Sequence, residues 1–569
     1  MVEIVASEAE LPPDHRVWGT GGWLMPEQRE ALDWLTLCLM LGWDARVVRR
    51  VIPASGGAHA IVLGRDPDEL GEDCVAAISR RLASEPILVI ARAGRPGGSF
   101  ARLAGASRRS EVIMGRSVRW TGPGGFQDWC CREPLEGAGL DLSAETTTWS
   151  TLDGAPLIVA RREGRGTVAT LAFHPSEARD KDGAATSLLK HLIIWGSLMP
   201  VAWLELGGTL VLRMDDPGGA QNVFSAGWRY AKLGEAEWAA IAADLRRRQG
   251  RLSIGYVGGW VDDGDATRGE LHVNGSAPAR VPGLVYPSPL VRYRDLAGHA
   301  PGTLYDYSSE YRGIERLRAA GLGEVELHGY THMHPDTSAW AAAPDRYHGQ
   351  PWFRELGKTA RAALALQSPQ EHSLALGVAG LERYFQVRPT TLIPPGDEWT
   401  DEALERALDL GLQLVSSYYL AIRHDNRFCW TTHVCAPYLN RPDSVWFAAG
   451  LPVVGYFHDY EPATEGAGWM SRWLDRWQEA GARRLIDLRE LAAALGRRLR
   501  VEGAPGELRL SVGDHGAPSM PRPLRVGIRI PTGTLPSSLP VRCGHREISL
   551  PVGSTGNGVG ELTLMNDPG

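Results

Sequence analysis

The sequence predicts an α/β protein built on a distorted (β/α) barrel, with a doubly wound α/β domain before it and a small all-β domain after it. Three observations predict this architecture. Apolar runs of strand length and of helix length alternate over residues 1–200 and again over 201–500. In the second stretch, polar residues gather directly after the strands, and beyond about residue 500 Gly and Pro separate short alternating runs. We therefore expect three domains, at 1–200, 201–500 and 501–569.

Composition places the chain among globular proteins without nucleic-acid or membrane partners. Its 569 residues suit three or four domains at about 150 residues each. With 43% hydrophobic and 22% charged residues, the chain has enough apolar surface to fold, which excludes general disorder. The net charge of −7 argues against a nucleic-acid binder, because the few basic runs, such as Arg246–Arg248, are too short to follow a phosphate backbone. The chain shows no secretory signal pattern and no apolar run of about 18 residues, so we expect a cytoplasmic protein without a membrane span unless the chain is trimmed.

The N-terminal segment reads as alternating helices and strands, with helices expected at 31–41 and 184–195 and strands at 58–63, 86–91 and 167–173. This pattern resembles the glutamine-amidotransferase-like, flavodoxin-type domains often attached to carbohydrate enzymes. Cys130 and Cys131 fall beside Trp129 in an expected loop, and no cysteine occupies a nucleophile elbow. We therefore expect a structural or ligand-orienting role rather than amidotransferase chemistry. The seven cysteines include no CxxC pair, which argues against a disulfide framework and a thiolate zinc site.

The middle segment has the strand and helix order of a (β/α) barrel. Residues 261–308, rich in Gly, Pro and Asp, are too long for an ordinary connection, so we expect a substrate-side insertion there. Short strands beyond residue 500 indicate a supporting β appendage. Barrel strands are expected at 209–214, 252–257, 325–327, 391–393, 412–416 and 453–457, barrel helices at 236–248, 310–319, 401–410 and 469–480, and appendage strands at 507–511, 524–530 and 547–550.

Two adjacent carboxylates, Asp215 and Asp216, end the first strand of the barrel segment and precede a Pro-Gly turn. Barrel enzymes assemble their sites at the C-terminal ends of strands, and neighbouring residues at a strand end point in different directions. One carboxylate can therefore ligate a metal while the other holds a water. The alternative is that Asp-Asp-Pro-Gly is only a polar turn.

Three histidines, His328, His332 and His334, follow the strand at 325–327. A spacing of four residues projects two imidazoles from one face if the segment turns helically. Neutral imidazoles and one carboxylate suit zinc or a similar divalent ion, with a position open for water. Histidines without a ligand role are the alternative. The Asp pair in the same predicted barrel favours metal ligation by His328 together with His332 or His334.

A further histidine, His458, ends the strand at 453–457. When protonated it can donate to a leaving group, and the alternative is a hydrogen-bonded core histidine. Between the histidines, a strand breaks into a rigid loop of Pro394, Pro395 and Gly396. This loop either walls a pocket in which Trp399 offers a stacking surface to a sugar, or only begins the next helix.

Read in this order, the segments resemble the NodB-type polysaccharide deacetylase superfamily, carbohydrate esterase family 4 and its relatives, over little more than half of the chain. The resemblance implies that Asp215 is the catalytic base and His458 the general acid. It implies that Asp216, His328 and His332 hold a divalent ion, Zn²⁺ first and Co²⁺, Ni²⁺ or Mn²⁺ as alternatives. Such an ion acts as a Lewis acid on water and on the acetyl carbonyl. The products would be acetate and a free amine.

Two positions depart from the family pattern Arg-x-Pro-Tyr-Gly. Leu392 replaces the arginine that orients the base, and Arg388 and Arg213 are the candidate substitutes. Pro395 replaces the tyrosine whose N–H helps to hold the oxyanion, and proline has no N–H. Gly396 or the metal would then take over that role.

The sequence therefore favours a metal-dependent N-deacetylase acting on a sugar or glycoside, and a homo-oligomer stays open. A second hypothesis is an inactive carbohydrate-binding or scaffold protein, motivated by the missing arginine and by Pro395. A third is a metal-free glycoside hydrolase that pairs Asp215 with Glu326 or Asp459, because such enzymes need two carboxylates.

Overall fold

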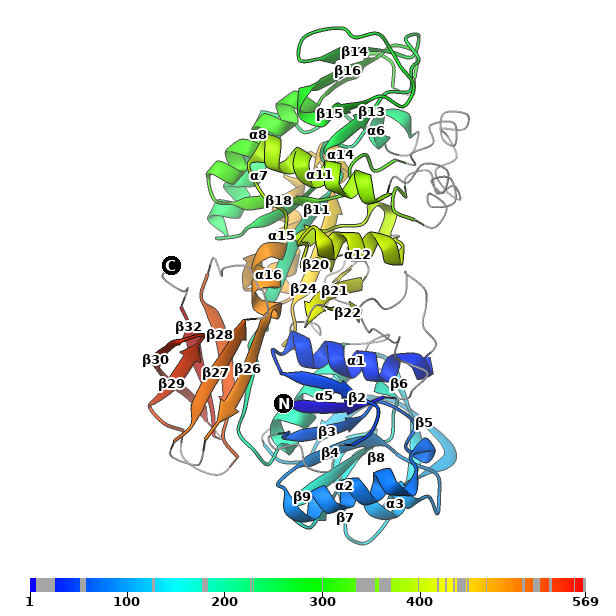
Figure 1. Ribbon diagram of the computed structural model, residues 1–569, viewed down its shortest axis with the longest axis vertical. Helices are drawn as coiled ribbons and strands as arrows, with labels where there is room; N and C mark the ends of the chain where they lie inside the picture. Colours follow the sequence, from blue (N-terminus) through cyan, green and yellow to red (C-terminus); the bar gives the residue numbers. More distant parts are fainter. Residues whose placement is uncertain are drawn as a thin grey trace.

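The computed structural model contains two large sheets, each with a parallel part and an antiparallel part, and a C-terminal pair of smaller β-sheets (Figure 1). The structure describes residues 1–6, 26–51, 58–124, 128–175, 183–225, 228, 230–298, 300–333, 354–357, 370–397, 399–416, 419–424, 427–432, 435–436, 447, 450–466, 468–503, 507–514, 522–531, 535–556 and 558–565. Among these residues, none of the helices has the length and apolarity needed to cross a bilayer.

The N-terminal sheet begins as a doubly wound parallel sheet and continues as antiparallel strands. Side chains of its parallel strands alternate between two cores. Helices α1 (Pro26–Met40) and α5 (Gly183–Gly196) cover one face, and α2 (Glu72–Ser84) and α3 (Ser99–Ala104) cover the other. In spatial order the described strands are β2 (Ala45–Val48), β1 (Val2–Val5), β3 (Ala60–Leu63), β4 (Leu88–Arg92) and β9 (Gly166–Leu171), all parallel, then β8 (Ala155–Glu163), β7 (Thr146–Leu152), β5 (Ala106–Trp120) and β6 (Trp129–Leu142), antiparallel.

The loop expected around Cys130 and Cys131 is wrong, because both residues lie in β6. Strands β5 and β6 form a long hairpin at the edge of the sheet. Much of β5 is exposed on both of its faces, including Val112 and Met114. A strand without one consistently buried face lacks the period-two apolar alternation by which strands are recognised in a sequence.

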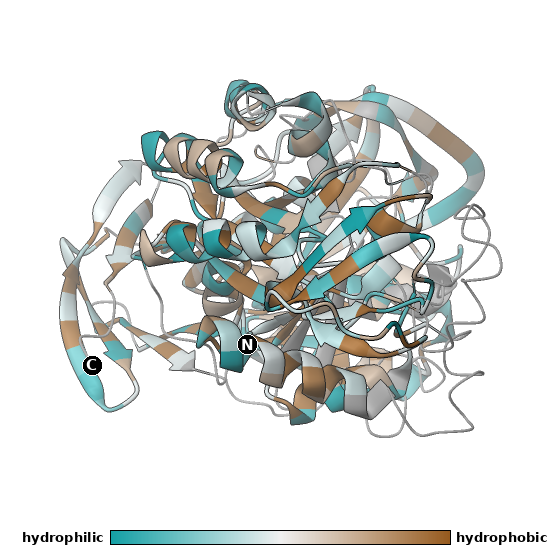
Figure 2. Cartoon of the chain, turned by 90° about the horizontal axis from the view of Figure 1, so that it is seen from above, coloured by the Kyte–Doolittle hydropathy of each residue, from teal (hydrophilic) through white to brown (hydrophobic). Residues whose placement is uncertain are grey.

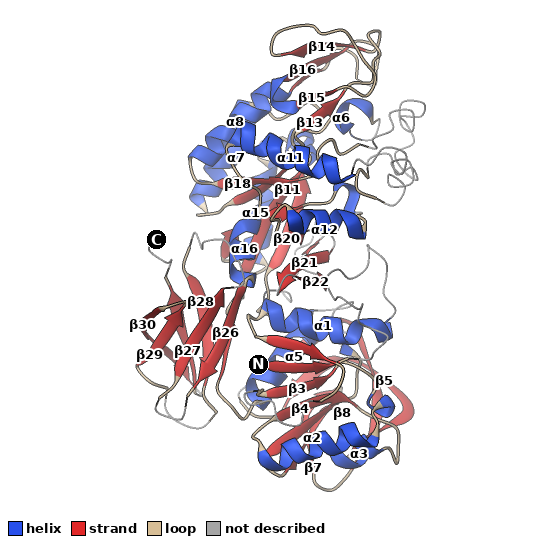
Figure 3. Cartoon of the chain, in the orientation of Figure 1, coloured by secondary structure: helices blue, strands red, loops and turns tan. Residues whose placement is uncertain are grey.

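The middle sheet is parallel over most of its width, and helices lie beside it (Figure 3). All six barrel strands expected from the sequence are present, although their ends differ by a few residues. The described strands do not close into a barrel, since β22 and β23 end the strand order. That order is β22 (Arg427–Thr432), β21 (Tyr419–His424), β20 (Leu414–Ser416), β19 (Thr391–Leu392), β18 (Gly323–Leu327), β12 (Leu252–Tyr256), β11 (Thr209–Asp215), β24 (Val453–His458) and β23 (Cys435–Ala436), with β25 (Arg484–Ile486) beside β11.

The helices of the middle unit present apolar faces to this sheet. In α15, Trp469, Trp473 and Trp477 recur at four-residue spacing and are buried. In Figure 2, apolar and hydrophilic residues alternate along the helices of the chain. The four expected helices are present, and the other four helices of the described residues were not expected. The described helices are α6 (Gln221–Phe224), α7 (Glu235–Arg247), α8 (Tyr307–Ala319), α11 (Gln370–Phe385), α12 (Asp401–Asp409), α14 (Tyr460–Glu465), α15 (Trp469–Glu479) and α16 (Leu488–Leu495).

The expected insertion forms two small antiparallel sheets with their own aromatic core, at the top of Figure 1. The Gly259 N–H donates to the Tyr330 carbonyl over 2.7 Å, so the insertion lies beside the loop that follows β18. The insertion is therefore on the side of the sheet that carries the histidines. Its strands are β13 (Gly259–Val261), β14 (Gly269–Val273), β15 (Val285–Pro287), β16 (Val291–Asp295) and β17 (Leu304–Asp306).

The C-terminal unit consists of two four-stranded sheets, and the expected domains do not match it: one of its strands lies in the expected barrel segment, and the expected boundary after residue 500 cuts through another. Strand β10 lies in the segment assigned to the barrel, but it pairs with β28. Strand β26 begins before residue 501. One sheet contains β26 (Arg497–Glu502), β27 (Arg509–Asp514), β29 (Ser538–Cys543) and β30 (Arg546–Pro551), and the other β10 (Val201–Leu204), β28 (Leu524–Arg529), β32 (Val559–Leu564) and β31 (Gly553–Gly556).

Candidate metal centre and acid–base pair

Parallel strands bring the sequence motifs to one edge of the middle sheet. Asp215 of β11 and His458 of β24 are register partners on neighbouring strands. His328 directly follows β18, and its N–H donates to the Tyr256 carbonyl at the end of β12 (3.2 Å). Because the carboxyl ends of parallel strands meet at the same edge, side chains distant in sequence become neighbours here.

The turn after β11 aims Asp216 away from Asp215. Asp216 adopts φ 79° and Gly218 adopts φ 83°. A Cβ on Gly218 would lie 2.3 Å from the Val257 carbonyl oxygen, so this position requires glycine. The Gly218 N–H donates to Glu310 Oε2 over 2.8 Å, which ties the turn to α8. The segment is a polar turn, as the alternative reading held, and it also presents a carboxylate to the histidines.

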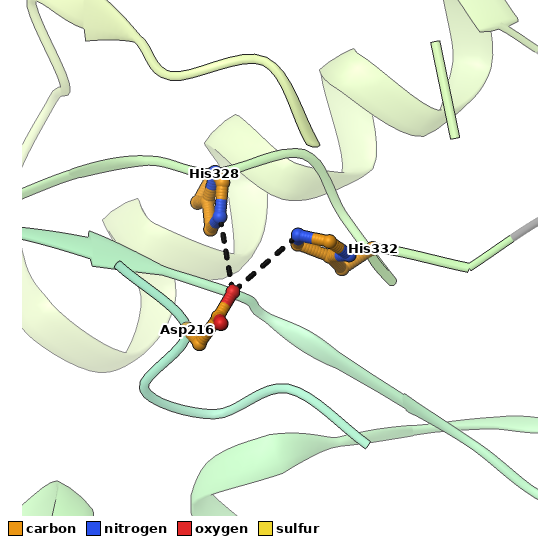
Figure 4. Close-up of side chains that lie close together, drawn as sticks. All are labelled: Asp216, His328 and His332. Carbon is orange, nitrogen blue, oxygen red and sulfur yellow. Dashed lines mark hydrogen bonds and ion pairs between the residues drawn. The ribbon is translucent and has the colours of Figure 1, made fainter. Parts of the chain in front are cut away.

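Asp216, His328 and His332 form the cluster drawn in Figure 4. Asp216 Oδ1 lies 3.2 Å from His328 Nε2 and 3.4 Å from His332 Nε2. Two ligand atoms held about 2.0–2.1 Å from a tetrahedral zinc ion lie about 3.3 Å apart. The spacing and the chemistry of these donors therefore fit a zinc-sized divalent ion. His334 lies outside the described residues.

Hydrogen bonding fixes how His328 presents its ring. His328 Nδ1 lies 2.8 Å from the Ile393 carbonyl oxygen, which can only accept, so Nδ1 carries a proton and Nε2 faces Asp216. Burial lowers the pKa of His332 to about 4, with help from neighbouring His328, so its imidazole is neutral. Burial also opposes a charge on His328, but Asp215 and Asp216 outweigh it and raise its pKa. A divalent ion would take the place of the His328 Nε2 proton, since metal binding releases protons from its ligands.

Of the two arginines considered as substitutes for the missing one, Arg213 is the one that contacts Asp215. Arg213 Nε donates to Asp215 Oδ1 over 2.8 Å, and Nη2 donates to Oδ2. Its Nη1 donates to the Ser416 carbonyl oxygen over 3.1 Å, and its guanidinium lies 4.9 Å from the Tyr456 ring centroid. Burial alone would raise the pKa of Asp215, but Arg213 outweighs it and lowers the pKa below its usual value. Arg388 instead donates to the Leu410 carbonyl oxygen, away from Asp215.

The Pro394–Gly396 loop lies beside this arginine. Gly396 has φ 61° and is followed by Asp397, whose Oδ1 is 3.9 Å from Arg213 Nη2. Trp399 is fully buried in the core, so it offers no stacking surface to a sugar, and that expectation is wrong. Thr400 accepts from the Ala403 N–H and caps α12, as the helix-start alternative held.

His458 has the environment of a proton donor. Its N–H donates to Glu461 Oε2 over 2.7 Å, and its Nδ1 lies 3.4 Å from Glu461 Oε1. Burial lowers the pKa of His458, but Glu461 and the two aspartates outweigh it and raise the pKa to about 9. The preceding Phe457 packs against Trp469 and Trp473 of α15, which anchors the end of β24 to this helix. The Trp228 ring contacts the His458 ring edge-on at 4.8 Å between centroids.

The carboxylates proposed as partners of Asp215 in a glycosidase are engaged elsewhere. Glu326 accepts from the N–H groups of Thr390 (2.7 Å) and Thr391 (2.8 Å). Asp459 accepts from Tyr230 Oη and from the fully buried Lys232, which also pairs with Glu310 at 3.2 Å. These contacts give Glu326 and Asp459 structural roles and disfavour the paired-carboxylate hypothesis.

Several site residues were missed in the sequence. Glu461 follows His458 by three residues, a spacing at which a helical turn brings side chains together. Arg213 was not missed, since it is one of the two candidate substitutes, and its position two residues from Asp215 on one strand, where both side chains share a face, favours it over Arg388. Lys232 and Ser416 are far from the motifs in sequence, and no local pattern marks them.

Comparison with known proteins gives structural likenesses only. Neither a protein-family model nor a curated protein sequence matches the chain. The chain is similar to a structure described as Agd3, a novel carbohydrate deacetylase, with 11% identity and a TM-score of 0.42 over 99% of this chain and 98% of that one. It is also similar to BA3943, a CE4 family pseudoenzyme from Bacillus anthracis, with 10% identity and a TM-score of 0.27 over 50% of this chain and 66% of that one. Because these identities and TM-scores are low, the functional argument depends on the side chains of the site.

Proposed function

We propose that the chain is a metal-dependent amide hydrolase that removes an N-acetyl group from a sugar or glycoside and releases acetate and a free amine. The observation that carries the proposal is the arrangement of Asp216, His328 and His332 at ligand spacing, beside an arginine-held Asp215 and its register partner His458. The resemblance of these motifs to NodB-type deacetylases supplies the acetylated sugar as substrate class.

The residues suit zinc best among divalent ions, because two imidazoles and one carboxylate leave a position open for water. When bound, such an ion supplies Lewis-acid activation of the water and of the acetyl carbonyl oxygen. The protein contributes a fixed ligand set, since His328 is oriented by the Ile393 carbonyl oxygen.

Asp215 would accept the proton of the attacking water at one of its carboxylate oxygens. Its lowered pKa keeps it ionised at neutral pH, and Arg213 fixes the direction in which it faces. His458 would donate its proton to the departing nitrogen, because an amine leaves readily only when protonated. Its raised pKa and its bond to Glu461 keep that proton available.

The test is acetate release from a panel of N-acetylated sugars, with full-length protein before and after chelation and after zinc is restored. The proposal expects release that chelation abolishes and zinc restores, and loss of release in Asp215→Asn. Release unaffected by chelation would overturn the metal mechanism. Cleaved glycosidic bonds without acetate would indicate a glycosidase, and sugar binding without acetate release under any metal would indicate an inactive binding protein.

A further inference from the structure

The loop that carries His332 is wrapped around one buried carboxylate. Glu355, only 3% exposed, lies 23 residues after His332 in the sequence. Its Oε2 accepts from three consecutive backbone N–H groups, those of Tyr330 (2.9 Å), Thr331 (3.1 Å) and His332 (3.0 Å). Successive N–H groups that converge on one anion form a nest, in which each bond to a charged acceptor is stronger than a neutral one.

The loop needs this anion because its backbone is unusual. Gly329 has φ 68° and His332 has φ 58°, a left-handed conformation that is unfavourable for a non-glycine residue because its Cβ crowds the following carbonyl oxygen. A Cβ on Gly329 would lie 2.4 Å from Glu355 Oε2 and 2.5 Å from Pro395 Cγ. The chain therefore passes very close to the carboxylate, and the hydrogen bonds offset the strain at His332.

We infer that Glu355 is a positioning residue that sets the His332 imidazole at ligand distance from Asp216 Oδ1. This inference rests on the proposed metal site. The backbone N–H of His332 bonds to Glu355 while its ring lies 3.4 Å from Asp216, so one residue connects the nest to the ligand set. Removing a residue that orients a metal ligand typically lowers metal affinity about 10–100-fold.

The experiment measures the zinc affinity of metal-free, full-length wild type and Glu355→Gln by competition with a chromophoric chelator. Gln keeps the size of the side chain and one accepting oxygen but loses the charge. The matched control is Asp295→Asn, because Asp295 is also a buried carboxylate that accepts two backbone N–H groups, from Gly298 (2.6 Å) and Ala300 (2.7 Å), in the insertion. We expect about 10-fold or greater loss of affinity in Glu355→Gln and unchanged affinity in Asp295→Asn.

A spectroscopic readout separates positioning from general stability. With Co²⁺ in place of Zn²⁺, the ligand-field absorption should change in Glu355→Gln and stay as in wild type in Asp295→Asn. Wild-type affinity and spectrum in a folded Glu355→Gln would overturn the inference, whatever its melting temperature. Wild type that binds no divalent ion would instead overturn the proposed function.

A second measurement needs no folded variant. Amide hydrogen exchange of wild type should be slow at Tyr330, Thr331 and His332, because all three donate to a buried acceptor. Exchange at the rate of exposed amides would show that the nest does not persist in solution and would overturn the inference.

Discussion

The hydrogen bonds between Arg213 and Asp215 give a quantitative prediction for the proposed catalytic base. Two N–H groups of one guanidinium bind the carboxylate, and both residues are buried. Hydrogen bonds to charged groups contribute about 1.5–3 kcal/mol each, and loss of one partner from a buried ion pair costs about 3–5 kcal/mol. Arg213→Met should therefore destabilise the protein by about 3–5 kcal/mol.

Arg213→Lys tests orientation without removing the charge. Lysine presents one ammonium in place of a planar fork, so it cannot hold both Asp215 oxygens and Ser416 together. A base displaced by about 1 Å costs about 10²-fold in rate, and a general base is worth at most about 10⁴-fold. We expect kcat/KM for acetate release to fall about 10²-fold, with zinc affinity unchanged.

The pH dependence of kcat/KM shows in which direction Arg213 changes the pKa of Asp215. Arg213 lowers the pKa of Asp215 in the folded protein, so it favours the ionised base, and the resulting stability is lost as pH falls through that pKa. Arg213→Met should move the acid limb of kcat/KM to higher pH. The control is Arg388→Lys, which changes an arginine that does not contact Asp215. Wild-type kcat/KM in Arg213→Lys, or an unmoved acid limb in Arg213→Met, would refute the assignment of Asp215 as the oriented base.

Two further substitutions test other parts of the site. Glu461→Gln should move the alkaline limb of kcat/KM to lower pH by about one unit or more, because Glu461 stabilises protonated His458. An unchanged alkaline limb would exclude His458 as the proton donor. Gly218→Ala should lower the thermal unfolding midpoint and the zinc affinity more than Gly275→Ala does. Both positions have positive φ, but only a Cβ at Gly218 meets a backbone oxygen, so equal effects would contradict the turn argument.

The architecture could be predicted where apolar periodicity was strong. The buried strands of the middle sheet are near-continuous apolar runs, which is typical of parallel strands covered on both faces. The β5–β6 hairpin is largely exposed and was missed for that reason. The domain boundaries were predicted from composition changes. The pairing of β10 with β28, a strand more than three hundred residues later, spans the predicted boundary after residue 500.

The candidate ligands, base and acid could be predicted from the sequence because they lie at the ends of strands or, for His332, in the loop directly after one. The residues that contact these side chains could not be predicted, because those contacts depend on the tertiary structure. Lys232 meets Asp459, and Glu355 meets the His332 loop, across segments that share no local pattern. Trp399 was misjudged because a large aromatic side chain after a loop suits the core as well as a sugar.

The central claim is that Asp216, His328 and His332 hold a divalent ion that Asp215 and His458 use for amide hydrolysis. The most direct measurement is metal content by elemental mass spectrometry on dialysed wild type and four single variants. The account predicts about one ion per chain in wild type, loss of the ion in Asp216→Asn and His328→Ala, and retention without acetate release in Asp215→Asn and His458→Gln. Wild type that stays empty after incubation with zinc, cobalt and nickel, or ligand variants that keep a full ion, would contradict it.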